Sequence, residues 1–596
     1  MVARFLVTTA REETWPTNNE PILFLGDWCK LYTRRRTWEK LDSIVSTYHW
    51  NNRSKFNKDF LYLQRLNEEL LGELTAKLNI IHKVNYSSRY WRIVVGPWLA
   101  FFSQMAFDRW EMIRLALHNN DISDVRIINY QNNPFVPNEM NDFNSMYIED
   151  SWNEFIYGSI LAWKKFPVHK IDIKNNPHND SCNKKLLDLP AGFKKKLRKL
   201  INFISGLSYN KKDFFFISSY FSTKFEIFLQ FKLGQVPSLW ASIPSPLGQI
   251  NLNARNWQLS DSKNVNDFSS FLRFIIPLHI PINYLEGYKL SKILCKNLPW
   301  PKRPKAIFTA NSFMFDDVFK VWAAGKTEEG VPLITGQHGG HYGIGSWSFL
   351  EEHQIAISDY FLTWGWKKPK HNKVIPVGNI KGFGKSFKAK KTGIALMVQV
   401  AIPRQSYQIL SSIVSASQWG EYFDDQCRFF EALPDKLQAH IVIRLYPTDY
   451  GYSQKERWLE RFPRVILDEG KRPIGFQINK TKLYISTYNA TTYLESMSLN
   501  IPTIIFWNTK HWELKDSAAP YFEKLKLAGI FHENPESAAN QMIKVWDNIE
   551  DWWNSPEVQS ARIDFCKEYA YIPEKPLETL EKIFLKIADK PQREVI

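Results

Sequence analysis

Apolar residues along the chain fall into two alternating patterns. Short runs rich in β-branched and aromatic residues, at 5–7, 22–25, 125–128 and 214–217, are typical of buried strands. Between them, apolar residues repeat at helical spacing, as the leucines of residues 63–78 do. Strands that alternate with helices predict an α/β fold built on parallel sheets.

The alternation becomes more regular after residues 297–304, which hold three prolines in eight positions. Proline cannot donate to a sheet, so this composition indicates a connection between domains. Further strands are predicted at 306–309, 331–334, 360–363, 374–377, 394–398, 441–445, 483–485 and 503–506. They predict a doubly wound sheet that binds ligands at the C-terminal ends of its strands. The expected domains are residues 1–298 and 299–545, with helices at 546–596 that can cross back to the first domain.

One apolar run in the first domain carries a breaker. Residues 90–98 read Tyr-Trp-Arg-Ile-Val-Val-Gly-Pro-Trp. Val and Ile favour strands and Gly-Pro interrupts them, so we expect a strand that stops at Gly96 and Pro97. Arg92 then either solvates the edge of the sheet or binds an anion.

A glycine-rich loop, residues 334–345, holds five glycines and two histidines in twelve positions. Glycine permits positive φ and a close approach of the backbone, so the loop can present N–H groups and the imidazoles of His338 and His341 to an anion. The spacing fits neither the P-loop nor the dinucleotide fingerprint. A tight turn is the alternative, but binding residues concentrate on loops after strands, and we expect a function.

Two further strand ends carry polar groups. Arg444 ends the run 441–445, where its guanidinium either binds a phosphate or forms an ion pair within the fold. Residues 486–495 link a strand to a helix and offer more hydroxyl and amide groups than one helix cap requires. Because a helix N-terminus adds free N–H donors and a positive dipole, we expect a phosphate site there, on the same sheet as the glycine-rich loop.

Charged residues follow the first two strands of the chain. Arg11, Glu12 and Glu13 come shortly after the run 5–7, and Asp27 comes after the run 22–25. This position favours ligand binding in α/β proteins, although a solvated turn explains these residues equally well.

Composition narrows the class of protein. A length of 596 residues is too great for one core, and a formal charge of +16 with a pI near 9.3 points to an anionic partner. The many aromatic residues suggest that some rings face clefts or an amphiphilic acceptor. The five cysteines are scattered and lack CxxC spacing, so neither a disulfide framework nor a zinc site is indicated, and a reducing cytoplasm fits best.

Membrane contact is expected to be peripheral. No apolar stretch is long enough to span a bilayer, and the N-terminal apolar run is too short for a signal peptide. In residues 193–204, Phe193 to Ile204, apolar residues share one helical face and cations the other. This segment is either an ordinary surface helix or a contact with anionic lipid at the inner face of the cytoplasmic membrane.

Three motifs resemble those of bacterial surface-polysaccharide transferases, a group that includes capsule Kdo transferases and teichoic-acid glycerophosphotransferases. They are Thr335-Gly-Gln-His-Gly339, Arg444-Leu-Tyr-Pro447, and Ser486-Thr-Tyr-Asn-Ala-Thr-Thr-Tyr-Leu-Glu495 followed by Asn500-Ile-Pro502. The C-terminal half thus resembles GT-B glycosyltransferases. The whole chain, including Phe5-Leu-Val-Thr-Thr-Ala-Arg-Glu-Glu-Thr-Trp15 and Gly26-Asp-Trp28, resembles a family of transferases encoded in bacterial surface-carbohydrate loci.

The resemblance implies a GT-B-like fold of two Rossmann-like domains that face a cleft. Residues 299–545 then hold a nucleotide-activated donor, and residues 1–298 hold the acceptor. It also implies that His338 lies at the active site and that Glu495 lies near the donor ribose. Many relatives have Arg-x-His-Pro where this chain has Tyr446, so a role for that histidine cannot be transferred.

We therefore hypothesise glycosyl transfer from a nucleotide sugar, with a lean to a CMP-activated acidic sugar that rests on the resemblance alone. Preorganised donors would neutralise the leaving phosphate. The expected donor-binding residues are Gly336, Gln337, Gly339, Arg444, Ser486, Thr487, Asn489, Thr491, Thr492 and Glu495. The expected catalytic residues are His338, His341 and an acidic base among Glu12, Glu13 and Asp27. No cofactor or metal is expected, because a GT-B site needs none and His338-Gly-Gly-His341 lacks the further ligands that zinc requires.

Other classes stay open at this stage. A CDP-alcohol-dependent phosphotransferase of cell-surface polymer synthesis would share the fold and the phosphate site. A non-catalytic carbohydrate- or nucleic-acid-binding protein would bind without turnover, but no zinc-finger, RRM-like or repeated basic-aromatic motif occurs, so nucleic acid is not an expected partner. The expected partners are a nucleotide sugar and a glycan or lipid-linked glycan of surface polysaccharide or lipopolysaccharide synthesis.

Overall fold

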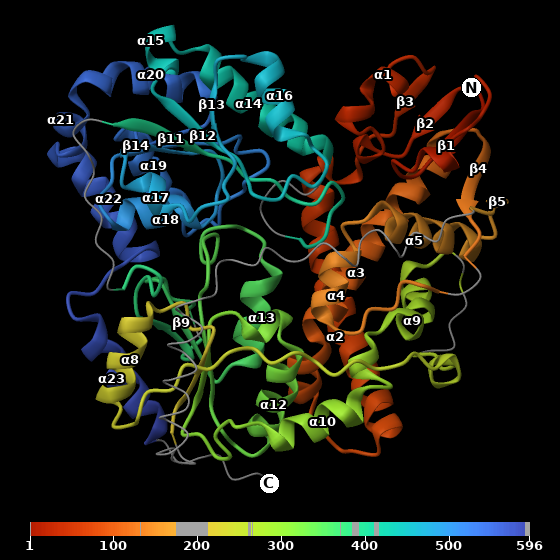
Figure 1. The fold of residues 1–596 in the computed structure, drawn as a ribbon, viewed down its shortest axis with the longest axis horizontal. Coiled ribbons are helices and arrows are strands. Elements are labelled where there is room, and N and C mark those ends of the chain that lie inside the picture. Colours follow the sequence, from red (N-terminus) through yellow and green to blue (C-terminus); the bar gives the residue numbers. More distant parts are fainter. Residues whose placement is uncertain are drawn as a thin grey trace.

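The computed structural model describes residues 2–130, 133–173, 213–259, 264, 266–369, 371–383, 393–409 and 416–589. These residues form three sheets, and all neighbouring strands within them run parallel. In Figure 1 the N-terminal sheet lies at the upper right in red and orange, the C-terminal sheet at the upper left in cyan and blue, and the central sheet, with β9, below. The predicted parallel α/β class is confirmed.

The N-terminal sheet has the order β3-β2-β1-β4-β5, the doubly wound order of Rossmann-like folds. Its strands are β1 (Arg4–Val7), β2 (Ile22–Phe24), β3 (Ser43–Val45), β4 (Ile122–Ile128) and β5 (His169–Ile171). Its helices are α1 (Arg35–Trp38), α2 (Arg53–His82), α3 (Ser88–Asn119), α4 (Met140–Met146) and α5 (Asp150–Trp163). The strands predicted at 5–7, 22–25 and 125–128 are confirmed to within a few residues.

The strand predicted at residues 90–98 is wrong, because these residues belong to α3, which continues through Pro97. Helices α2, α5, α12 and α13 all pack against α3, so its apolar residues are buried on every side. Gly96 allows α13 to come close, since a Cβ there would lie 2.9 Å from Cε1 of His353. Arg92 lies at no sheet edge and instead donates to Glu68 of α2 at 2.6 Å.

The central sheet has the sequential order β10-β9-β8-β7-β6. Its strands are β6 (Phe215–Ile217), β7 (Ile307–Thr309), β8 (Leu333–Gly336), β9 (Tyr360–Thr363) and β10 (Val374–Pro376). Nearby helices are α8 (Thr223–Lys232), α9 (Phe268–His279), α10 (Tyr288–Asn297), α11 (Ser312–Phe315), α12 (Asp317–Glu328) and α13 (Phe349–Ile357). The expected domain boundary at residue 299 falls between β6 and β7, which are hydrogen-bonded neighbours.

The C-terminal sheet has the order β13-β12-β11-β14-β15-β16, again doubly wound. Its strands are β11 (Ile394–Val398), β12 (Ile441–Arg444), β13 (Ile466–Asp468), β14 (Thr481–Ser486), β15 (Thr503–Phe506) and β16 (Phe531–His532). Its helices are α14 (Ala416–Glu431), α15 (Asp435–Gln438), α16 (Gln454–Arg461), α17 (Gly475–Ile478), α18 (Thr491–Ser498), α19 (Ala519–Leu527) and α20 (Pro535–Val545).

The glycine-rich loop and residues 486–495 do not share one sheet, as we expected them to. The loop follows β8 of the central sheet, and residues 486–495 follow β14 of the C-terminal sheet. The apolar pattern predicts each strand but contains no information on which strands pair.

The last helices are α21 (Ile549–Trp553), α22 (Pro556–Tyr569) and α23 (Pro576–Ala588). Helix α23 packs against α8, and the ring of Phe584 lies 5.2 Å from that of Phe216. Residues 193–204, the predicted lipid contact, lie outside the described residues. Of the helices that the structure describes, none combines the length and apolarity needed to cross a membrane.

Candidate functional site

The C-terminal sheet has a topological switch point between β11 and β14, where the strand order reverses. In doubly wound sheets the ligand crevice lies outside the C-terminal ends of the strands at this point. The two strand ends are joined there, because Oγ1 of Thr487 donates to the carbonyl oxygen of Val398 at 2.8 Å. Residues 486–495 therefore begin at the position where this fold class binds its ligand.

The N-terminus of α18 opens at the switch point. Its N-cap is Ala490, and within the described part of the chain no side chain caps its N–H groups. The neighbouring Asn489 is buried; its Oδ1 accepts from the Tyr493 hydroxyl at 3.0 Å, whereas its Nδ2 has no partner among the described residues. Free donors and a positive helix dipole are suited to bind an anionic oxygen.

Other polar residues in this segment hold the loop in shape. Oγ of Ser486 donates to the carbonyl oxygen of Tyr488 at 3.3 Å, and Thr492 donates to the Tyr488 hydroxyl at 3.4 Å. Thr487 also contacts the Tyr422 hydroxyl at 2.7 Å. Ser486 and Thr487 are buried, so the predicted phosphate-binding duty falls on the start of α18.

The glycine-rich loop of the central sheet lies directly against the start of α18. The N–H of Gly340 donates to Oγ1 of Thr491 at 2.9 Å. A Cβ on Gly340 would lie 2.0 Å from the carbonyl oxygen of Ala490, a distance that no side chain could tolerate. Glycine is therefore required by the close approach of two backbones. We call residues 336–345 and 486–495 together the loop–helix junction.

The far end of the same loop is fixed to another part of the C-terminal half. Gly345 and Leu514 form an isolated antiparallel bridge, and the N–H of Lys515 donates to the carbonyl oxygen of Ile344 at 2.8 Å. The loop thus spans from the central sheet to two segments of the C-terminal half.

Both histidines of the loop are held in neutral form. Burial, helped by Lys381 and His341, lowers the pKa of His338 to about 3, and Nδ1 of His338 lies 3.2 Å from the Tyr342 hydroxyl. Burial, helped by Lys515, lowers the pKa of His341 to about 4. Neutral imidazoles can exchange hydrogen bonds with a substrate but bring no charge to it.

Gln337 and Gly336 have structural positions in the loop. Oε1 of Gln337 accepts from the Trp364 N–H at 3.0 Å and from Nε1 of Trp366 at 2.8 Å, while Nε2 donates to the carbonyl oxygen of Gly339 at 2.8 Å. Gly336 ends β8 against Phe308, to which a Cβ would come within 3.0 Å. These contacts set the path of the backbone that presents His338.

Arg444 follows the second of its two predicted alternatives. Nη1 forms an ion pair with Asp468 at 2.5 Å, and Nη2 donates to the carbonyl oxygens of Gly470 and Arg472. The side chain is almost fully buried. The structure thus favours an ion pair within the fold, and phosphate binding by Arg444 would have to compete with it.

The three acidic candidates lie at the C-terminal edge of the N-terminal sheet. Among the described residues, Glu12 pairs with Arg34 at 2.5 Å, Glu13 with Arg11 at 2.5 Å, and Asp27 with Lys30 at 3.0 Å. These pairs are local, and they do not bring the carboxylates to the loop–helix junction.

The edges of the two doubly wound sheets nevertheless face one another. Arg404, after β11, donates to the carbonyl oxygen of Trp28 and to Asp150. Arg35 forms an ion pair with Glu460 at 2.6 Å. Two Rossmann-like units facing across their strand ends were predicted, whereas the central sheet beside them was not.

Tyr220 and Lys381 were missed as site residues. The Tyr220 ring lies 6.3 Å from that of His338, and Nζ of Lys381 lies over the Tyr220 ring at 4.8 Å. Ser218 and Tyr220 both have positive φ, a strain that concentrates at functional sites. Their signal was available, because polar residues directly follow the apolar run 214–217.

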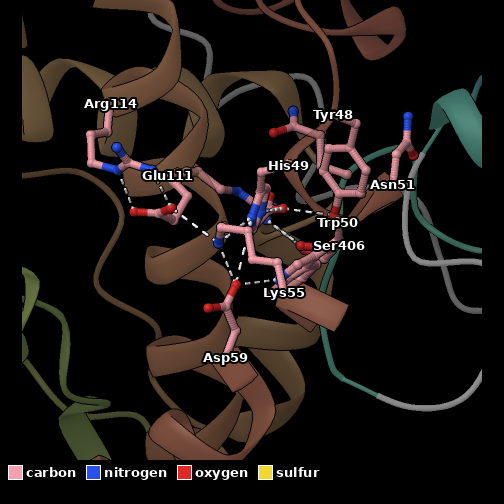
Figure 2. Close-up of polar contacts among 12 residues, drawn as sticks. Tyr48, His49, Trp50, Asn51, Lys55, Asp59, Glu111, Arg114 and Ser406 are labelled. Carbon is pink, nitrogen blue, oxygen red and sulfur yellow. Dashed lines mark hydrogen bonds and ion pairs between the residues drawn. The ribbon is translucent and has the colours of Figure 1, made fainter. Parts of the chain in front are cut away.

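A second polar cluster joins the N-terminal helices to the C-terminal half. We call it the anchor network, and Figure 2 shows most of its side chains converging between α2, α3 and the segment around Ser406. Its members are Tyr48, His49, Lys55, Asp59, Asp108, Arg109, Glu111, Arg114, Asn153 and Ser406.

Arg109 is the centre of the anchor network. Its guanidinium is fully buried and donates to Asp108, to Asn153 and to the carbonyl oxygen of Ser406 at 2.6 Å. Asp108 also accepts from Tyr48 at 2.7 Å and contacts His49 at 3.0 Å. The network fixes the segment after β11 to α3, and hence fixes one wall of the switch point.

Comparisons with solved structures return distant glycosyltransferase-related folds. A variant of the wall teichoic acid polymerase TagF is 10% identical, covers 66% of this chain and 93% of its own, and has a TM-score of 0.34. MurG from Acinetobacter baumannii is 9% identical, with 63% and 99% covered and a TM-score of 0.29. The spinosyn rhamnosyltransferase SpnG, solved with spinosyn aglycone, is 12% identical, with 50% and 76% covered and a TM-score of 0.27.

A search of curated proteins finds no match. The model of one protein family, the LIC12162 family of transferases, matches residues 4–584, which is nearly the whole chain. The match includes all three sheets and both halves of the loop–helix junction. The chain therefore belongs to the LIC12162 family of transferases.

Proposed function

We propose that the protein is a GT-B-type glycosyltransferase that moves a sugar from a nucleotide-activated donor to a growing bacterial surface glycan. One observation carries the proposal: an uncapped helix N-terminus, the Asn489 amide and the neutral His338 meet at the switch point of a Rossmann-like sheet. This combination supports a site for a nucleotide phosphate beside a group that can contact a substrate hydroxyl.

The proposed reaction places the leaving phosphate at the start of α18. The N–H groups and the helix dipole would stabilise the negative charge that grows on the phosphate as the sugar departs. Glu495, one turn inside α18, is proposed to bind the donor ribose. His338 would contact the transferring group, with Tyr342 holding its Nδ1.

The remaining parts are proposals that follow the sequence. If the reaction requires an acidic base, Glu12, Glu13 and Asp27 are the candidates, and each would have to leave its cationic partner. The CMP-activated acidic sugar and metal independence belong to the same proposal. A peripheral contact of residues 193–204 with anionic lipid would be tested by liposome co-sedimentation, which neutral replacements of its lysines should weaken.

The test is nucleotide release from a panel of CMP-, UDP- and GDP-sugars and CDP-glycerol, with and without a metal chelator. We expect turnover of one nucleotide sugar that persists with chelator. His338→Ala and Glu495→Ala should each lower turnover at least tenfold, whereas the exposed controls His118→Ala and Glu557→Ala should not. Full activity in both site variants would refute the assignment, and turnover of CDP-glycerol alone would replace it with phosphotransfer.

A further inference from the structure

A cavity of about 310 Å³ lies between α2, α3 and α13, with Ile409 of the C-terminal half in its wall. The volume is at the lower end of the range for small-molecule pockets, about 300–1,000 Å³. Parts of the chain that are far apart in sequence meet there, and ligand sites prefer such boundaries. None of its lining residues belongs to the loop–helix junction.

Two buried polar groups in the lining lack partners. His353 is 4% exposed and Asn67 is 9% exposed. Neither Nε2 of His353 nor Oδ1 of Asn67 has a hydrogen-bond partner among the described residues. An unpaired buried polar atom is costly, so two of them around one cavity indicate a bound molecule that pairs with them.

The charges around the cavity balance. Its charged lining residues are Arg65, Arg92, Glu68 and Glu352. Arg92 donates to Glu68 at 2.6 Å, and Glu352 accepts from Lys368, outside the lining, at 2.7 Å. Burial lowers the pKa of His353 to about 3, so that its imidazole adds no charge at neutral pH. A lining without net charge is suited to an uncharged ligand.

We propose that this cavity binds the apolar part of an uncharged amphiphile whose hydroxyl groups pair with Asn67 and His353. Phe60, Leu63 and Phe349 supply the apolar wall. A hydroxyl group both donates and accepts, so it can satisfy the Asn67 carbonyl oxygen and either tautomer of His353.

Helix α13 connects this cavity to the loop–helix junction. Ser348, the N-cap of α13, contacts Nε2 of His341 at 3.0 Å. His353 follows five residues later, about 7.5 Å along the helix axis. A bound amphiphile would thus lie beside the candidate transfer site, where an acceptor could keep its apolar portion. That use as an acceptor rests on the proposed function, whereas binding itself does not.

The experiment measures binding of n-hexyl, n-octyl and n-decyl β-D-glucoside by calorimetry, below their micelle-forming concentrations and without any donor. We expect the dissociation constant to fall about fourfold for each methylene that enters the cavity. Alkyl sulfates and alkyltrimethylammonium ions of equal chain length should bind at least tenfold more weakly. Absence of binding, or affinity independent of chain length, would overturn the proposal.

A variant locates the site. Ala356 lines the cavity on an exposed position of α13, so Ala356→Trp should fill the mouth and weaken octyl glucoside binding at least tenfold. The matched control is Ala76→Trp, on an exposed position of α2 outside the lining, which should bind as wild type does. Equal affinity in a folded Ala356→Trp would overturn the proposal. A photoreactive alkyl glucoside gives an independent readout, because labelling must map to residues 60–68 and 349–356, and labelling elsewhere would contradict it.

Discussion

The anchor network and the loop–helix junction both collect polar groups from distant parts of the chain, but they use them differently. In the anchor network the guanidinium of Arg109 and the carboxylate of Asp108 are fully engaged. In the junction the start of α18 is uncapped, and Nδ2 of Asn489 has no partner among the described residues. Satisfied networks stabilise a fold, whereas unsatisfied donors at a strand end await a ligand. The comparison separates a structural polar cluster from a functional one.

The largest expected effect comes from breaking the anchor network with Arg109→Met. Removing one partner of a buried charged pair costs about 3–5 kcal/mol, because the other charge stays buried. Thermal and urea unfolding would measure the loss. Arg114→Met is the control, since Arg114 pairs with Glu111 on a side chain that is 43% exposed, and it should cost less than about 1 kcal/mol. Equal costs would show that the network does not stabilise the fold as argued.

The second effect concerns the junction and should appear in activity. In Gly340→Ala the new methyl group must displace the Ala490 carbonyl oxygen, so the loop and α18 move apart. A misplacement of this size costs about 100-fold in turnover. Gly72→Ala on α2 is the matched control, because nothing lies within 4 Å of its added Cβ. Wild-type turnover in Gly340→Ala would contradict a close-fitting junction.

Both results depend on features that the sequence predicts unequally. Strands at 360–363, 394–398 and 503–506 coincide with β9, β11 and β15, because short apolar runs between turn residues leave little choice. Residues 90–98 failed, since the same valines and isoleucine serve a helix that is buried on all sides.

The site divides along the same line. The glycine-rich loop and residues 486–495 are visible as dense local patterns, and the structure brings them together. Their contact joins residues 151 positions apart on different sheets, and no local pattern contains that pairing. The partners of Arg444 could not be chosen either, because Asp468 lies on a neighbouring strand.

A third prediction concerns pH. His338 and His341 have pKa values lowered to about 3 and 4, so they stay neutral in the folded protein at pH 5, whereas in the unfolded chain they are protonated below about 6.5. Their stabilising effect is therefore complete above pH 6.5 and is lost as pH falls toward 3, by up to about 2 kcal/mol each at pH 5. NMR of the imidazoles from pH 8 to 5 should show no titration of either ring. A midpoint near 6.5 would contradict it.

The smallest expected effect is that of Thr491→Val. The change leaves the Gly340 N–H without its acceptor and should cost about 1 kcal/mol. The control Thr579→Val, whose hydroxyl donates within exposed α23, should stay within about 0.5 kcal/mol of wild type. Differential scanning calorimetry compares the two, and a cost no greater than that of the control would mean that this hydrogen bond contributes little.

The central claim is that a nucleotide-activated donor binds at the loop–helix junction, and amide hydrogen exchange of the protein with and without its best nucleotide tests it most directly. Bound nucleotide should slow exchange in peptides covering residues 336–345 and 486–498, and the anchor network should exchange equally slowly in both samples. Protection confined to other segments, with the junction unchanged, would contradict the account.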